Sequence, residues 1–483
     1  DLLCTIFTIN YLTLNTLVLA FKFRFKIEIM DMKKLSIYTL AAFSMIGTLG
    51  AKSLSLITGE NGEISGKFDW NDTSNWTPTV SEVAGNDLNL NFSTTTEVTS
   101  TINAGFTAGD VVVNVKQNAP AGSDGGHGHF FVNIEGDTTF DSLTYNMTSP
   151  AWWGSYIRIK TGSTLTINND LYAGNSGTNA NFINFASNNM ADYLGNIYVK
   201  GNLVFTSNAP GPQTHALWTQ LGDFTVKGAF VMKAANVGDT GRWRISNATT
   251  TIGGLSGEST SVHQIYIDND TSITFTNKSD YSWNGLITDA DSGAANAKKL
   301  NIVMDASATG KQTMSITGGS LNDITLNGGK FVLSSATATT GKVSLNGGYF
   351  GVGNNSIAIN SAEWTSGGLL FDMAAIKNGY KITIENAFTK NGDGLIEIDF
   401  DGLNGADYID DTFELLSAGS LEGFDVDDAN ANFVAKNLYG ALADFAWDGN
   451  NLSVTFTQVP EPAAIAAFFG AAALILALRR RRG

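Results

Sequence analysis

A strand-sized pattern that repeats along the middle of the chain limits the possible folds more than any other feature. Residues 197–205 align without a gap on residues 224–232, and residues 324–333 align on residues 343–352. In each copy, two apolar residues at positions i and i+2 are followed by a Gly-containing corner and a second apolar pair. This period of two is that of a β-strand with one buried face. No amphipathic helical pattern separates the copies, which excludes architectures that alternate strands with helices.

Two looser copies extend the pattern. Residues 157–167 repeat it with a one-residue insertion, and residues 314–319 form a half-step copy shortly before 324–333. The spacing is longer between the first two copies than between the last two, which is typical of solenoids whose loops vary on the outside. We therefore predict an all-β fold, a right-handed parallel β-helix with at least five stacked units between residues 155 and 356; a β-sandwich is the alternative. The side chains predicted to face the core are Ile197, Val199, Phe224, Val226, Ile324, Leu326, Val343 and Leu345.

The composition fits an exported protein made of strands and turns. Only 15% of the residues are charged, 52 are Gly, and Asn, Ser and Thr are abundant, as in chains rich in strands and turns. The formal net charge of −16 argues against a nucleic-acid partner, because phosphates require Lys and Arg. The only cysteine is Cys4, so residues 52–483 can form neither an internal disulfide nor a Cys-ligated metal site. We expect no cofactor.

Residues 1–51 have the character of a segment that is absent from the mature protein. A basic pair follows Met32, an apolar run spans residues 35–49, and small residues precede Lys52. This order of basic, apolar and small residues is that of a secretory signal peptide. We therefore assign residues 30–51 to a signal peptide and residues 1–29 to upstream sequence translated ahead of the true start.

The C-terminal segment, residues 459–483, consists of three parts. A short motif comes first: Val459, Pro460, Glu461 and Pro462. The run Ala463–Leu478 has no charged or amide residue and suits a helix in hydrocarbon, although about 20 residues are usually needed. Four arginines follow and should stay on the cytoplasmic side: Arg479, Arg480, Arg481 and Arg482. We predict a C-terminal transmembrane helix with the preceding chain outside the inner membrane.

This ending resembles the PEP-CTERM sorting signal of bacterial exported proteins. The resemblance rests on Pro460-Glu461-Pro462, the apolar segment and the arginine cluster at the C-terminus. It implies processing near the Pro-Glu-Pro motif by an exosortase, a membrane cysteine protease, after transient anchoring in the inner membrane. The same signal is also catalogued as an ice-binding protein C-terminal domain, which by itself implies nothing about ice. A plain membrane anchor is the alternative.

The tryptophans are candidates for sugar binding. Trp70 and Trp76 bound a Trp-x-x-x-x-Asn-Trp motif that resembles the opening of secreted β-solenoid and autotransporter-like proteins. They could stack on sugars, but we expect them to cover one end of the core, because an open solenoid end requires a cap. An outward row of the tryptophans between residues 152 and 283 would suggest a polysaccharide groove, and core or loop packing is the interpretation we favour. These residues are Trp152, Trp153, Trp218, Trp243 and Trp283.

Two polar clusters are candidate metal sites. His127 and His129 stand near Asp124, but no third strong ligand is evident and the neighbouring glycines indicate a loop. Residues 393–428 hold twelve Asp or Glu and no Lys or Arg, without EF-hand spacing. We expect a solvated acidic face and no metal site.

The chain thus divides into an N-terminal β region with a cap at residues 52–150, the repeats at 151–390, an acidic β region at 391–458 and the sorting signal at 459–483. It contains no Gly-x-Ser-x-Gly, His-Glu-x-x-His or P-loop motif, and we expect no enzyme. The expected function is that of an exported structural protein of the cell surface or extracellular matrix. A carbohydrate- or ice-binding surface module and a β-helix polysaccharide lyase or hydrolase are the alternatives. The expected partners are the processing protease, the membrane and extracellular polysaccharide.

Overall fold

The computed structural model separates the chain into two units, residues 1–52 and residues 53–483. Of the first unit only Lys52 is described, so the predicted leader and signal peptide lie outside the described residues. The structure describes residues 52–59, 66–94, 96–117, 129–149, 153–177, 181–186, 191–208, 215–234, 241–247, 249–257, 263–289, 298–334, 340–403, 407–459 and 470.

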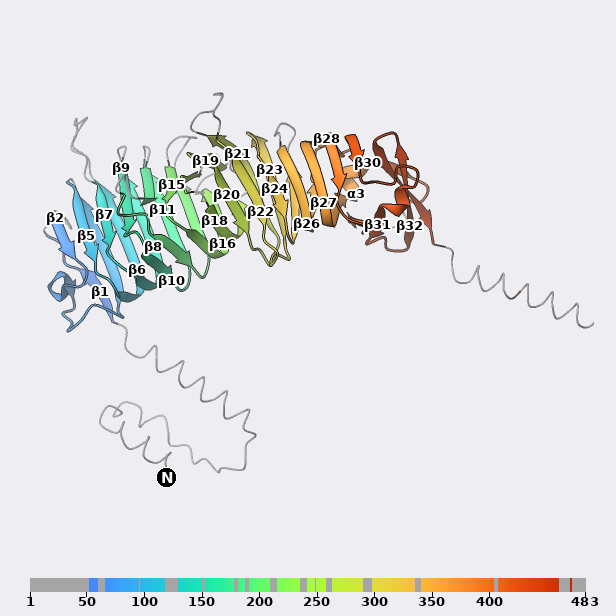
Figure 1. Cartoon of the computed structure of the whole chain (residues 1–483). Coiled ribbons are helices and arrows are strands. Elements are labelled where there is room, and N and C mark those ends of the chain that lie inside the picture. Colours follow the sequence, from blue (N-terminus) through green and yellow to red (C-terminus); the bar gives the residue numbers. More distant parts are fainter. Residues whose placement is uncertain are drawn as a thin grey trace, which may run out of the picture. The chain divides into compact units, whose positions relative to one another are not determined.

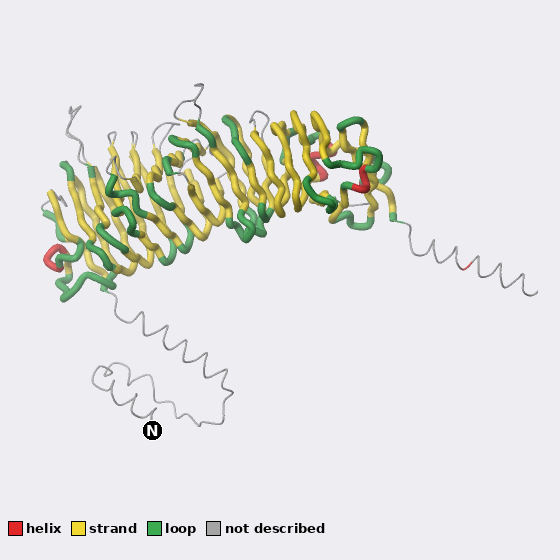
Figure 2. The backbone as a smooth tube through the Cα atoms, viewed as in Figure 1, coloured by secondary structure: helices red, strands yellow, loops and turns green. Residues whose placement is uncertain are grey.

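The second unit is all-β, and its strands form one large sheet (Figures 1 and 2). The elements are β1 (Ser53–Leu56), β2 (Gly66–Asp69), η2 (Thr73–Asn75), β3 (Trp76–Thr77), β4 (Asp87–Thr94), β5 (Val98–Ile102), β6 (Thr107–Gln117), β7 (Phe130–Ile134), β8 (Thr138–Ser149), β9 (Trp153–Ile159), β10 (Thr164–Ile167), β11 (Leu171–Gly177), β12 (Asn181–Ala186), β13 (Asn196–Val199), β14 (Leu203–Asn208), β15 (His215–Gln220), β16 (Phe224–Ala234), β17 (Arg242–Ile245), β18 (Thr249–Gly257), β19 (His263–Ile267), β20 (Thr271–Phe275), β21 (Tyr281–Asp289), β22 (Leu300–Met304), β23 (Lys311–Gly318), β24 (Ile324–Leu326), β25 (Lys330–Ser334), β26 (Thr340–Val352), β27 (Ile357–Asp372), α3 (Met373–Lys377), β28 (Ile382–Lys390), β29 (Ile396–Asp401), β30 (Thr412–Glu422), η4 (Ala429–Ala431), β31 (Phe433–Lys436), β32 (Ala441–Asp448) and β33 (Asn451–Gln458).

Parallel pairing dominates the sheet. Among the described strands, the antiparallel pairs are β1–β3, β30–β33 and β32–β33. A strand typically pairs with strands two or three positions away in sequence, as β13 does with β10 and β16, and β24 does with β22 and β26. The chain therefore returns again and again to lie beside its earlier strand, in the same direction.

The ladder register agrees with the gapless repeats. Ile197 pairs with Phe224, and Ile324 pairs with Val343, as the two alignments require. All eight side chains predicted to face the core are at most 1% exposed. The prediction of their inward orientation is confirmed, and its cause is the alternation of buried and outward residues along each strand.

The two looser alignments are wrong in register. The strand at residues 197–199 pairs with residues 165–167 of β10. Residues 157–159 lie on β9, which pairs with β7 and β12 instead. Met314 pairs with Leu333, and not with the strand that begins at Ile324. The apolar alternation is the same in every strand, so the pattern alone does not distinguish one strand of a repeat from the next.

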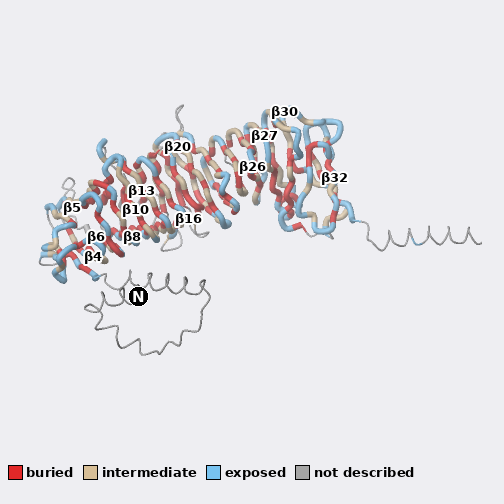
Figure 3. The backbone as a smooth tube through the Cα atoms, turned by 60° about the horizontal axis from the view of Figure 1, so that its bottom comes forward, coloured by how far each residue is buried: buried red, intermediate tan, exposed pale blue. Residues whose placement is uncertain are grey.

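One continuous apolar core runs through the second unit, from Leu54 on β1 to Phe456 on β33 (Figure 3). At the first end, Trp76 pairs with Leu56 in the antiparallel β1–β3 contact. At the other end, the hairpin β32–β33 pairs with β30. Both ends of the ladder thus carry a local antiparallel contact in place of a further parallel strand.

Among the described residues, no helix is long and apolar enough to cross a bilayer. The α-helix α3 is a short turn, and its start is capped by the Asp372 carboxylate, which accepts a hydrogen bond from the Ala374 amide at 2.7 Å. The predicted transmembrane segment, residues 463–478, lies outside the described residues apart from Gly470.

Candidate functional site

The structure describes only the first residue of the predicted sorting motif. Val459 directly follows β33, is 39% exposed, and donates a backbone hydrogen bond to the Gly440 carbonyl at 3.4 Å. Residues 460–462 and the arginines at 479–482 lie outside the described residues, so their sorting role stays a prediction.

The tryptophan motif forms part of the core. Trp70 and Trp76 are each 1% exposed, their rings meet edge to face at 6.2 Å, and the Trp76 indole N–H donates to the Trp70 carbonyl at 3.0 Å. Trp70 also stacks on Phe140 at 6.2 Å. These contacts fit the predicted end cover, and they leave neither ring available for a sugar.

The tryptophans between residues 152 and 283 form no exposed row in the part of the chain that the structure describes. Trp243 and Trp283 are fully buried in the core. Trp218 is half-buried on the outside, where the Arg244 guanidinium lies 4.2 Å from its ring centre. Arg244 is in turn held by Asp268 at 2.8 Å. Trp152 and the side chain of Trp153 lie outside what the structure describes.

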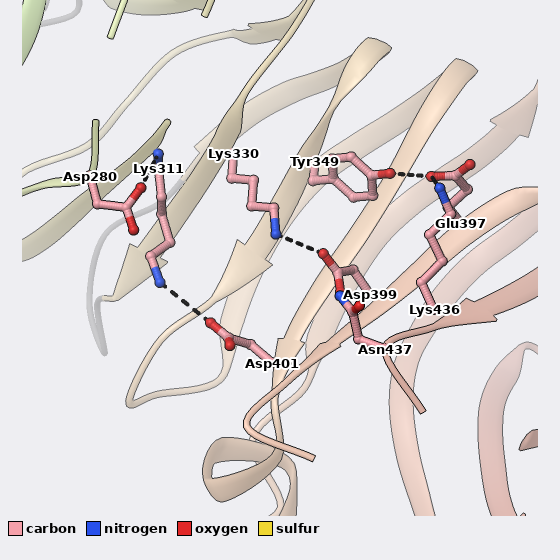
Figure 4. A network of polar contacts seen from close by, with 9 residues as sticks. All are labelled: Asp280, Lys311, Lys330, Tyr349, Glu397, Asp399, Asp401, Lys436 and Asn437. Carbon is pink, nitrogen blue, oxygen red and sulfur yellow. Dashed lines mark hydrogen bonds and ion pairs between the residues drawn. The ribbon is translucent and has the colours of Figure 1, made fainter. Parts of the chain in front are cut away.

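Three carboxylates of the acidic segment point to one face of β29 (Figure 4). Glu397, Asp399 and Asp401 alternate along this strand, so they share a side of the sheet. The Lys330 ammonium on β25 binds Asp399 at 2.7 Å, and Lys311 on β23 lies 3.4 Å from Asp401. The predicted solvated face is therefore only partly correct, because several of its acids are neutralised by lysines from distant strands.

Hydrogen bonds from neighbouring strands complete this charged network. Asn437 donates to Asp399, and both Tyr349 and Lys436 donate to Glu397. Partial burial raises the pKa of Glu397, but these two donors outweigh it and hold the pKa below its usual value. Burial and the hydrogen bond to Glu397 raise the pKa of Tyr349. Glu397 is therefore an ionised, paired carboxylate rather than a proton donor.

The charged network spans a concave part of the sheet. Lys311 and Asp401 lie four strand positions apart, which would separate their backbones by about 19 Å in a flat sheet. The two charged groups are nevertheless only 3.4 Å apart. The face is thus concave along this diagonal, as the twist of parallel strands allows. A hollow of ≈ 170 Å³ lies there, lined by Lys311, Thr313, Ser315, Val332, Ser334, Val352, Gly353, Asn354, Leu370, Asp372 and Asp401.

A second, larger hollow lies on the outer face of β8, β10, β13 and β16. These strands pair in register, so Thr139, Thr166, Tyr198 and Thr225 form one outward column. We call this hollow the Tyr198 groove, and its volume is ≈ 490 Å³. Its lining is Asp137, Thr138, Thr139, Thr164, Thr166, Asn196, Ile197, Tyr198, Asp223 and Thr225.

Hydrogen bonds between strands fix the polar edge of the Tyr198 groove. Asp137 Oδ1 accepts from the Thr164 amide at 2.9 Å, and Asn196 Oδ1 accepts from the Asp223 amide at 2.8 Å. The Asp137 carboxylate therefore stands at a defined position beside the hydroxyl column, while Asn196 fixes the backbone of Asp223, whose carboxylate is exposed. The sequence did not predict this groove, although Tyr198 aligns with Thr225 in the gapless repeat and marks the one tall residue of the column.

The predicted histidine pair is described only in part. His127 lies outside the described residues, and His129 packs against Phe131 and Tyr156 with ring centres 5.6 and 5.5 Å away. Its Nδ1 lies 3.1 Å from the Gly154 carbonyl oxygen. Within the described ranges, no group of three or more His, Cys, Asp or Glu side chains could hold a metal ion.

Comparison with known proteins returned no counterpart: no protein-family model, curated protein or solved structure matches this chain.

Proposed function

We propose that the paired strands form a right-handed parallel β-helix. The support is the repeated return of the chain to a parallel, in-register position beside an earlier strand, as β16 returns to β13 and β26 returns to β24 in the gapless repeats. The right hand follows from the preference of parallel crossover connections. A β-sandwich would require mainly antiparallel ladders, whereas the described ladders are mainly parallel.

On this architecture, the protein is an exported structural protein of the cell surface or extracellular matrix, sorted through its C-terminal PEP-CTERM signal. The single observation that carries the proposal is the continuous core from Leu54 to Phe456. Such a core builds a long scaffold, while the Tyr198 groove and the hollow beside Lys311 have mostly polar linings. Enzyme and cofactor pockets are usually apolar with a few convergent polar groups, so neither hollow resembles such a pocket, whereas an open polar groove is compatible with binding of a polar chain.

Two alternatives have less support. An ice-binding face would need a flat, uninterrupted array of threonines, but the outward column contains Tyr198 and continues to Val303 on β22. A lyase or hydrolase would need an available acid or base, but Asp399 and Glu397 in the concave face are held by lysines. We therefore place neither alternative ahead of the structural role.

The sorting part of the proposal is tested by replacing Pro460-Glu461-Pro462 with alanines in the full-length gene. The full-length protein is expected to accumulate in the inner membrane, because the Pro-Glu-Pro motif near which the resemblance places processing is removed. The matched control replaces the exposed Thr457 and Gln458, which precede the motif. If the triple variant is shortened and released like the native protein, the ending is a plain anchor or is processed elsewhere.

The export part is tested by sequencing the N-terminus of the released protein. We expect it to begin close to Lys52, because a basic region, an apolar region and small residues precede that position. A product that retains residues before Met30 would exclude both the signal peptide and the proposed start.

A further inference from the structure

We propose that the Tyr198 groove binds a neutral polysaccharide, with the phenol ring of Tyr198 packed on one face of a sugar. The binding rests on the proposed function in one respect: the extracellular location is where the protein would meet a polysaccharide. The binding chemistry itself follows from the described side chains of β8, β10, β13 and β16.

Tyr198 has a long side chain in a column whose other members, Thr139, Thr166 and Thr225, have short side chains. Thr166 on β10 and Thr225 on β16 pair directly with it on either side. A threonine side chain ends at the γ position, whereas the phenol ring extends several ångströms farther, so these neighbours do not flank the outer part of the ring. The Lys227 ammonium lies over the ring, 5.7 Å from its centre, so it approaches one face of the ring and brings a hydrogen-bond donor close to a sugar packed on the other face. A ring with an apolar face and a nearby polar group suits the mixed surface of a sugar.

The lining of the groove matches the hydroxyl groups of a glycan. Threonine hydroxyls both donate and accept, the Asn196 amide does the same, and the carboxylates of Asp137 and Asp223 accept strongly. The volume of ≈ 490 Å³ lies within the range of about 300–1,000 Å³ typical of ligand sites. The outward column continues in register across four strands. The groove is therefore wide enough for several sugar units to lie across these strands.

The charge of the groove selects for a neutral chain. The exposed carboxylates of Asp137 and Asp223 at its edge outnumber the one ammonium at the ring, that of Lys227, and the whole chain carries a formal net charge of −16. The groove carboxylates and the negative net charge of the chain both repel uronate or sulfate groups. The described tryptophans offer no competing platform. Arg244 lies over Trp218, and Trp447 is half-buried against Phe424 and Phe433. The others are buried: Trp70, Trp76, Trp243, Trp283 and Trp364.

The test is affinity electrophoresis of the full-length protein, purified in detergent, through gels that contain dextran, hydroxyethylcellulose or alginate. We expect retardation by at least one neutral polymer and none by alginate. Tyr198→Ala should weaken the binding about tenfold or more, as expected for a central aromatic anchor. Tyr198→Phe should bind like the native protein, because it keeps the ring.

The matched control is Tyr172→Ala, which removes a tyrosine that is 43% exposed on β11, away from the groove. It should leave the retardation unchanged, and circular dichroism should show that every variant is folded. Unchanged binding in Tyr198→Ala, equal losses in both alanine variants, stronger binding to alginate, or no binding to either neutral polymer would each overturn the proposal. Sorting of the Tyr198 variants should be normal, so failure here is distinguishable from failure of the PEP-CTERM proposal.

Discussion

Removal of the Phe230 ring is expected to destabilise the protein locally and strongly. The ring is fully buried, meets the Trp243 ring edge to face at 4.7 Å, and lies in register between Leu203 on β14 and Leu255 on β18. Phe→Ala in a packed core costs about 3–5 kcal/mol, of which the aromatic contact contributes about 0.5–1.5 kcal/mol. Because stacked strands contact mainly their neighbours, the loss should be concentrated in β14, β16 and β18.

Hydrogen exchange followed by mass spectrometry measures both the size and the extent of this effect. In Phe230→Ala, peptides from β14, β16 and β18 should exchange roughly a hundredfold to a few thousandfold faster, which corresponds to the expected free energy. Peptides from β28 and β30 should be unchanged. Tyr172→Ala, on an exposed position of the same region, should change stability by less than about 0.5 kcal/mol. Uniform acceleration along the whole chain, or less than about tenfold acceleration near Phe230, would refute the reasoning.

Three further outcomes are expected. Lys330→Met should lower the free energy of unfolding by about 1–3 kcal/mol, because it leaves Asp399 buried with one partner fewer. Lys311→Met, at a more exposed ion pair, should lower it by under about 0.5 kcal/mol. Urea titrations that give equal losses for the two variants would contradict this. Burial and the hydrogen bond to Glu135 raise the pKa of Tyr193 to about 12, so its contribution to stability is complete below pH 10 and is lost as the pH rises toward 12. Tyr193→Phe should therefore flatten the fall of Tm between these pH values, and an unchanged slope would exclude this origin. Chelation with EDTA should shift Tm by less than about 1 °C, and a loss of many degrees would reveal a Ca²⁺ site in the acidic segment.

Local sequence determined which side chains of each strand are buried. Ile197 and Val199 face the core because apolar residues alternate with polar ones, and this alternation needs no knowledge of the neighbouring strands. The gapless repeats also identified correct ladder partners, such as Ile324 with Val343. Equal loop lengths in those repeats bring equivalent residues to equivalent positions. Where loop lengths differ, as around residues 157–167, the same pattern led to the wrong partner.

The sorting prediction also rests on the sequence alone, because it depends only on the composition and order of residues 459–482. The two candidate surfaces, by contrast, were decided only by tertiary structure. Lys330 and Asp399 are far apart in sequence, and they meet because the twisted sheet is concave between them. The groove likewise depends on four strands from different repeats lying in register. Periodicity encodes the face of a strand, whereas lateral neighbours and sheet curvature depend on loop lengths and on the summed twist of many strands, which no local pattern contains.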